Sequence, residues 1–129
     1  VRLNFNHPCK ELIWTEDATS GAFAQTAGNW TTALLKLNGH DRFDVETQKY
    51  FTDVQVLQHH TRRPGGGTVG VYSFALNPEE HQPSGTCNFS RIDNAQLQLT
   101  GVSNSCHIYA VNYNVLRIMS GMGGLAYSN

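Results

Sequence analysis

The stretch YSFALNPEEHQPSGTCNFSRID, residues 72–93, decides the fold because it is built as a connection between strands. It opens with an extended apolar segment at residues 72–76, passes through a turn-rich connection that contains Pro78 and Pro83, and ends in a short extended piece at residues 87–89. No part of it has the spacing of a catalytic nucleophile, a phosphate-binding loop or a zinc cluster. The stretch therefore indicates architecture, with no sign of enzymatic chemistry.

The segments that follow it continue the two-residue period of β-strands. Ala95, Leu97 and Leu99 alternate with polar residues, which predicts a half-buried strand at residues 94–100 with one face toward water. Residues 107–118 also alternate, and we expect one long strand there that bends or passes from solvent into a covered region. Further strands are expected at residues 11–15, 33–37, 53–57 and 68–76.

Turn signals separate these segments, and helix is scarce. Asn38-Gly39 is typical of a type I′ turn, and the glycines of residues 64–67 indicate a loop tip. A short helix is expected at residues 44–51. Glu79 and Glu80 are interpreted as the first turn of another short helix, where negative charge is favourable, and not as a catalytic acid and base.

About seven short strands with turns between them predict an all-β chain, an antiparallel β-sandwich or barrel. Within that class we expect a jelly roll, two packed sheets with Greek-key connections. The pattern by itself does not separate a jelly roll from an immunoglobulin-like sandwich. However, the Cys–Trp–Cys order of the latter is missing, because Trp14 and Trp30 both precede Cys87 and Cys106.

Composition limits the partners of this chain. With 129 residues, 40% of them hydrophobic, it is expected to form one domain, residues 1–129, with a core of its own. The net charge is −1, from nine basic and ten acidic residues, which argues against direct nucleic-acid binding. No apolar run approaches the roughly 18 residues that span a bilayer, so no membrane insertion is expected.

The cysteines and the glycosylation sequons leave alternatives open. Cys9, Cys87 and Cys106 lack CxxC spacing, and we expect reduced thiols, with one disulfide plus a free thiol as the alternative. Two sequons begin at Asn29 and Asn88. Because the cysteine usage argues against secretion, chance is the preferred explanation for both sequons.

Two alternative functions, a metal enzyme and a glycan-binding protein, are compatible with a β-sandwich of this composition. A cupin-like metal enzyme would use His59 or His60 with His81 and Glu80, but adjacent histidines on a strand point to opposite faces and no His-x-His is present. We expect the histidines to cap turns or to form hydrogen bonds at sheet edges. A lectin-like protein would bind glycans through an exposed Trp30, although aromatic residues of a sandwich are more often core.

Five segments, in this order along the chain, resemble the major capsid proteins of nucleo-cytoplasmic large DNA viruses, the iridovirus, phycodnavirus and asfarvirus group. The first four are LNFNHPCKELIW (residues 3–14), LNGHDRF (37–43), QHHTRRP (58–64) and the 72–93 stretch. The fifth is NYNVLRIMSGMGGLAYSN (residues 112–129), which is similar to the C-terminus of the family.

The resemblance implies a structural viral protein and not an enzyme, with no cofactor and no catalytic, cofactor-binding or metal-ligating residue. Family members carry two jelly rolls in tandem. Three copies form a pseudo-hexagonal capsomer of the icosahedral shell, assembled in the host cytoplasm, and its partners are further copies, neighbouring capsomers or minor capsid proteins. We therefore expect this chain to be the second, C-terminal roll of a longer protein, with a single-roll relative as the alternative. The glycine-rich residues 120–129 are expected to be too flexible to stand alone as a strand, and to pack against a neighbouring element.

Overall fold

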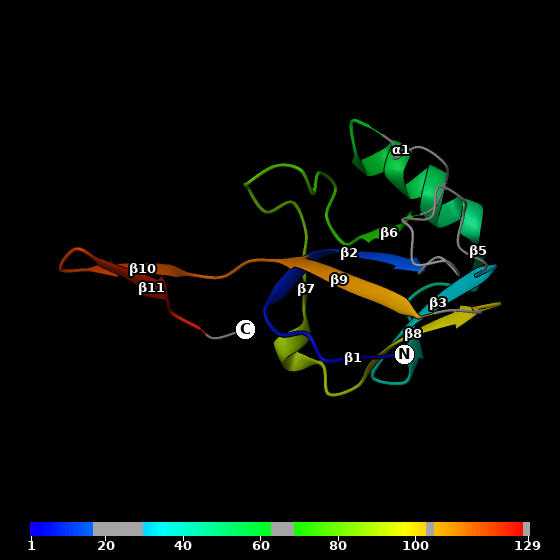
Figure 1. Cartoon of the computed structure of the whole chain (residues 1–129), viewed down its shortest axis with the longest axis horizontal. Helices are drawn as coiled ribbons and strands as arrows, with labels where there is room; N and C mark the ends of the chain where they lie inside the picture. The colour runs from blue at the N-terminus through cyan, green and yellow to red at the C-terminus, as the bar shows by residue number, and fades with distance from the viewer. Residues whose placement is uncertain (17–29, 63–68, 103–104, 128–129) are drawn as a thin grey trace.

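The computed structural model describes residues 1–16, 30–62, 69–102 and 105–127, and shows two packed antiparallel sheets (Figure 1). The first sheet contains β1 (Arg2–Leu3), β3 (Thr32–Leu37), β4 (His40–Asp41), β5 (Glu46–Thr47) and β8 (Ala95–Thr100). The second contains β2 (Pro8–Glu16), β6 (Val69–Ser73), β7 (Cys87–Asn88) and β9 (Cys106–Asn112). A separate hairpin is formed by β10 (Leu116–Met119) and β11 (Met122–Leu125).

Neighbouring strands come from distant parts of the chain. In the first sheet the order is β1-β8-β3-β4, and β5 also pairs with β3; in the second it is β6-β2-β7, and β9 also pairs with β2. All of these pairings are antiparallel. A chain whose strands cross between two packed antiparallel sheets in this way has the topology of a jelly-roll sandwich. The predicted fold class is therefore confirmed.

The longest strand, β2, faces the core along its whole length because of an irregularity near its start. Strict alternation from Cys9 would turn Leu12 and Trp14 toward the opposite face. The register against β9 shifts between Cys9 and Glu11, as in a β-bulge, and the extra residue corrects the phase. Cys9, Leu12 and Trp14 are therefore all fully buried.

A helical segment covers one end of the sandwich, and two predictions for this region are wrong. Residues 53–57 are not a strand, and the short helix lies later than residues 44–51: a π-helical turn (η1, Tyr50–Val54) runs directly into α1 (Gln55–His59). Phe51, Gln55 and Val56 are buried with helical spacing, while Val54 is exposed. Burial of Phe51 against the core therefore selects a helix.

The single strand expected at residues 107–118 is also wrong, since β9 ends at Asn112 and β10 begins at Leu116. The turn between them is fixed locally, because the Asn114 Oδ1 accepts a hydrogen bond from the Val115 N–H at 2.7 Å. Along β9 itself the alternation holds: Ile108 packs against the core and Tyr109 is 57% exposed.

The remaining turns show both agreement and disagreement with the sequence. Asn38 and Gly39 have φ of 52° and 80° between paired β3 and β4, so the predicted tight turn is confirmed. Glu79 and Glu80 lie in a turn and not in a helix, with the Glu80 N–H donating to the Asn77 carbonyl at 3.2 Å. The tail does form a strand, β11, as half of a hairpin with β10. The loop tip expected at residues 64–67 lies outside the described residues.

Gly70 of β6 has no room for a side chain, which gives a first prediction. It pairs with Trp14, and a Cβ atom at Gly70 would lie 2.4 Å from two atoms of the buried indole ring. We expect Gly70→Ala to lower the free energy of unfolding by about 1–3 kcal/mol, as overpacking of a core does. Chemical denaturation measures the loss, with Gly123→Ala as control because a Cβ atom there meets nothing within 4 Å. Equal losses for the two variants would contradict the prediction.

Candidate functional site

A cluster of polar side chains centres on His60, directly after α1. The His60 Nε2 lies 2.7 Å from the Glu11 Oε2 on β2, and the Nδ1 lies 3.0 Å from the Glu79 Oε1. Hydrogen bonds from His60 and from the Thr61 backbone N–H lower the pKa of Glu79. Since both imidazole nitrogens face carboxylates, the cluster is a hydrogen-bonded clamp that ties the end of the helix to β2 and to the turn after β6.

The metal site that the cupin-like alternative requires is not brought together. His60 engages Glu11 and Glu79 in place of Glu80 and His81, and both of the latter are exposed. The His59 Nδ1 lies 3.0 Å from the Leu76 carbonyl oxygen, so His59 and His60 form hydrogen bonds as the sequence led us to expect. Within the described ranges, no group of three or more His, Cys, Asp or Glu residues is arranged to hold a metal ion.

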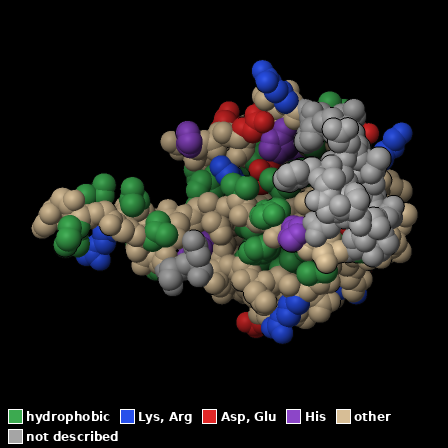
Figure 2. Space-filling model, viewed as in Figure 1, with side chains coloured by type: hydrophobic (Ala, Val, Ile, Leu, Met, Phe, Trp, Pro, Cys, Tyr) green, Lys and Arg blue, Asp and Glu red, His purple; other side chains and the backbone are tan. Residues whose placement is uncertain are grey.

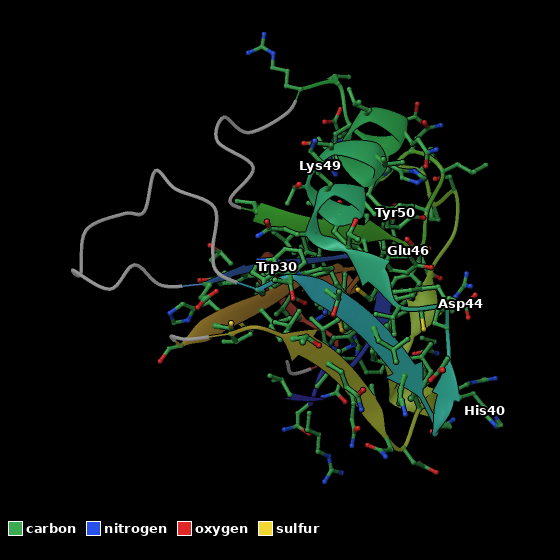
Figure 3. The ribbon with its side chains drawn as sticks, turned by 90° about the vertical axis from the view of Figure 1, so that its right-hand side faces the viewer. Trp30, His40, Asp44, Glu46, Lys49 and Tyr50 are labelled. Atoms are coloured by element: carbon green, nitrogen blue, oxygen red, sulfur yellow. The ribbon has the colours of Figure 1, made fainter. Side chains whose placement is uncertain are left out.

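The glycan-binding alternative is wrong, because it requires an exposed Trp30 and this side chain is buried. Trp30 is only 1% exposed and lies beside Trp14 and Phe51, with ring centroids 5.7 Å apart for the two tryptophans. Figure 3 shows Trp30 at the entry to β3, inward of the helical segment that starts at Tyr50, and His40 at the outer end of the same sheet. The tryptophans therefore build the core and offer no stacking platform.

The cysteines form no disulfide. Cys9 and Cys87 are free thiols, although they are directly paired across β2 and β7. Burial raises the pKa of Cys9 to about 12 and also raises that of Cys87, so neither thiol is activated as a nucleophile. Of the two sequons, Asn29 lies outside the described residues. Asn88 is exposed, and its Oδ1 accepts a hydrogen bond from the Ser90 N–H at 3.1 Å.

The feature that stands out on the surface is the β10–β11 hairpin, called here the arm, residues 116–125. It projects from the body in Figure 1, and Figure 2 shows hydrophobic side chains along it. Every residue of both strands is exposed. Its large apolar residues are between 56% and 75% exposed: Leu116, Ile118, Met119, Met122 and Leu125. Sequence reasoning divided this segment between a strand at residues 107–118 and a flexible tail at residues 120–129, and missed the arm.

The arm is held firmly at its base. The Tyr113 N–H donates to the Pro8 carbonyl at 2.9 Å, and the Asn114 Nδ2 donates to the Tyr127 carbonyl at 2.9 Å. A pocket of about 300 Å³ opens beside this base, lined in part by His7, Tyr113 and Tyr127. A fixed apolar arm with a pocket at its foot is suited to bind another polypeptide. Among the described residues, no helix is both long and apolar enough to cross a membrane.

These features, a two-sheet frame with a projecting apolar arm, define a β-sandwich of the jelly-roll class. A sequence model of the family described as "Large eukaryotic DNA virus major capsid protein" matches residues 1–124. The chain belongs to this family, which is one of capsid proteins and not of enzymes.

Named relatives agree with this assignment. The chain is 52% identical to a major capsid protein of Pyramimonas orientalis virus, over 100% of this chain and 39% of the relative. It is 40% identical to the major capsid protein of Paramecium bursaria Chlorella virus 1, over 100% of this chain and 43% of the relative. The chain therefore spans about two fifths of the length of these relatives.

A solved structure confirms the fold. The chain superimposes on a quasi-atomic model of the PBCV-1 virus capsid with a TM-score of 0.84 and 37% sequence identity. The superposition covers 100% of this chain and 45% of the solved one. The jelly-roll sandwich described above is thus the fold of a viral capsid protein.

Proposed function

We propose that this chain is a jelly-roll domain, residues 1–129, of a viral major capsid protein that builds the shell of the virion. The observation that carries the proposal is the family match over residues 1–124. The superposition of the whole chain on the PBCV-1 capsid structure supports it. The share of the relatives that the chain covers, 39–45%, suits one of two tandem rolls, and we propose that it is the second, C-terminal roll.

The physical properties of the domain fit a shell component. Paired antiparallel sheets around an aromatic core resist deformation, while loops and projecting elements are free to supply contacts. We propose that three copies form a pseudo-hexagonal capsomer through contacts closed by a three-fold axis, with neighbouring capsomers and minor capsid proteins as further partners. No residue is assigned a catalytic, cofactor-binding or metal-ligating role, and assembly takes place in the host cytoplasm.

Native mass spectrometry of the full-length protein, the product that contains this chain, tests the proposal. The expected result is a metal-free homotrimer, whose outline in negative-stain electron microscopy is pseudo-hexagonal. A monomer that carries one metal ion per subunit would contradict the capsid function and favour the metal-enzyme alternative.

A further inference from the structure

The two faces of the arm differ, and one of them is apolar throughout. In the β10–β11 register Leu116 pairs with Leu125 and Ile118 pairs with Gly123, and paired residues of an antiparallel hairpin share a face. Leu116, Ile118 and Leu125 therefore lie on one face, while the other carries Arg117 together with Met119 and Met122. A two-stranded hairpin is only marginally stable alone in water, so an arm of this kind needs something to cover it.

His7, which lines the pocket at the foot of the arm, gives a second, independent indication that a binding partner is missing. His7 is only 9% exposed and has a φ of 71°, an uncommon conformation for a residue other than glycine. Both backbone groups of His7 form hydrogen bonds: its N–H donates to the Ser90 Oγ at 3.0 Å, and its carbonyl accepts from the Phe89 N–H at 3.2 Å. Its Nε2 is buried without a hydrogen-bond partner among the described residues.

A buried imidazole nitrogen without a partner is unfavourable until a hydrogen-bonding group reaches it. The pocket wall beside His7 is formed by Tyr113, Val115 and Tyr127, the residues that also form the base of the arm. The pocket thus adjoins the base of the arm, where the apolar strands begin. One ligand can cover both of them.

We propose that this surface docks a polypeptide segment from the part of the capsid protein that lies outside residues 1–129, within the same subunit. The segment covers the face with Leu116, Ile118 and Leu125, and places a hydrogen-bonding group against the His7 Nε2. This inference rests on the proposed function, because it takes the chain to be part of a longer capsid protein.

The nature of the surface favours a polypeptide over a small molecule. The pocket holds only the foot of the surface, and most of the apolar area lies along the strands of the arm. Within the described residues, β10 pairs only with β11 and β11 only with β10, which leaves a strand edge open on each side. An extended segment can pair with such an edge while its side chains cover the apolar face.

Two considerations favour the same subunit over a second copy. The relatives place more than half of their length outside the matched region, so ample chain is present to supply the segment. A tethered segment also has a high effective concentration and covers the arm before assembly begins. A subunit whose arm waited for a second copy would expose an apolar hairpin with open edges, which invites aggregation.

Site-specific photo-cross-linking in the full-length protein tests the proposal. A benzophenone amino acid replaces Ile118 on the arm or, as the control, Leu57 on α1, which is also well exposed (68% and 73%). Cross-linked products are separated on a denaturing gel and mapped by mass spectrometry. We expect Ile118 to give cross-links within a single chain to peptides outside residues 1–129, and Leu57 to give no such cross-links.

A band of twice the subunit mass from position 118 would overturn the proposal in favour of a second copy, and absence of any cross-link there would also overturn it. Native mass spectrometry of the same sample keeps the two proposals distinguishable. A trimer without the intrachain cross-link contradicts only the docking, whereas the intrachain cross-link in a monomer contradicts only the trimeric capsomer.

His7→Asn tests the role of the pocket, because asparagine tolerates a positive φ but cannot reproduce the Nε2. We expect faster hydrogen–deuterium exchange of peptides from residues 116–125 in full-length His7→Asn than in the unsubstituted protein. Unchanged exchange would remove His7 from the proposed surface.

Discussion

Trp14→Ala is expected to lower the free energy of unfolding by about 3–5 kcal/mol, the usual loss when a large buried aromatic is truncated. Trp14 is fully buried, and its ring centroid lies 5.7 Å from that of Trp30 and 5.2 Å from that of Phe51. Trp30 lies just before β3 and Phe51 belongs to the helical segment, so the indole of Trp14 on β2 joins both sheets and the helix. Since domains are stable by only about 5–15 kcal/mol, the variant is expected to unfold at far lower denaturant concentration.

Trp14→Phe is the matched control. It keeps an aromatic ring in the core and removes the Trp14 Nε1–H, which is buried and has no hydrogen-bond partner among the described residues. We therefore expect a much smaller loss than for alanine. Urea unfolding followed by circular dichroism compares the two variants, because that signal does not depend on the tryptophan itself. Equal losses would show that the aromatic cluster is not what holds the two sheets together.

The strands that could be predicted from sequence are those whose alternation matches their burial. Residues 94–100 were expected as a half-buried strand, and Ala95 and Leu97 of β8 do face the core. The Asn38-Gly39 turn was predictable because its conformation is set by these two residues alone. Residues 53–57 were misassigned because a segment this short, with three apolar residues, fits both a strand and a helix. The contact of Phe51 with Trp14, which settles the choice, is invisible in the sequence.

The surface features were harder to predict, for two different reasons. Ser120 and Gly121 have φ of 51° and 78° between paired Met119 and Met122, so a two-residue turn signal was present but was taken as part of a flexible tail. By contrast, nothing local connects Glu11 to His60. These residues are 49 positions apart, and only the fold of β2 against the helical segment brings them within 2.7 Å.

His60→Ala is expected to destabilise the protein by about 3–5 kcal/mol at neutral pH, the range seen when a buried carboxylate loses its partner. The side chains of Glu11 and His60 are 7% and 17% exposed, so the Glu11 carboxylate would stay buried with its main partner gone. The contact with Glu79 contributes less, because its side chain is 42% exposed and its interaction with the imidazole is screened by solvent. The loss should therefore follow Glu11 and not Glu79.

A set of variants separates these contributions by urea unfolding at neutral pH. His59→Ala, at the neighbouring position, removes one hydrogen bond to the Leu76 carbonyl and should cost about 0.5–1.5 kcal/mol. Glu79→Gln should also cost much less than His60→Ala. The double variant Glu11→Leu/His60→Leu replaces both polar partners by apolar groups, and removal of a buried pair in this way is often close to neutral. We therefore expect it to be more stable than His60→Ala. If His60→Ala costs no more than His59→Ala, the Glu11 carboxylate does not depend on His60, and the clamp does not hold the helix to β2.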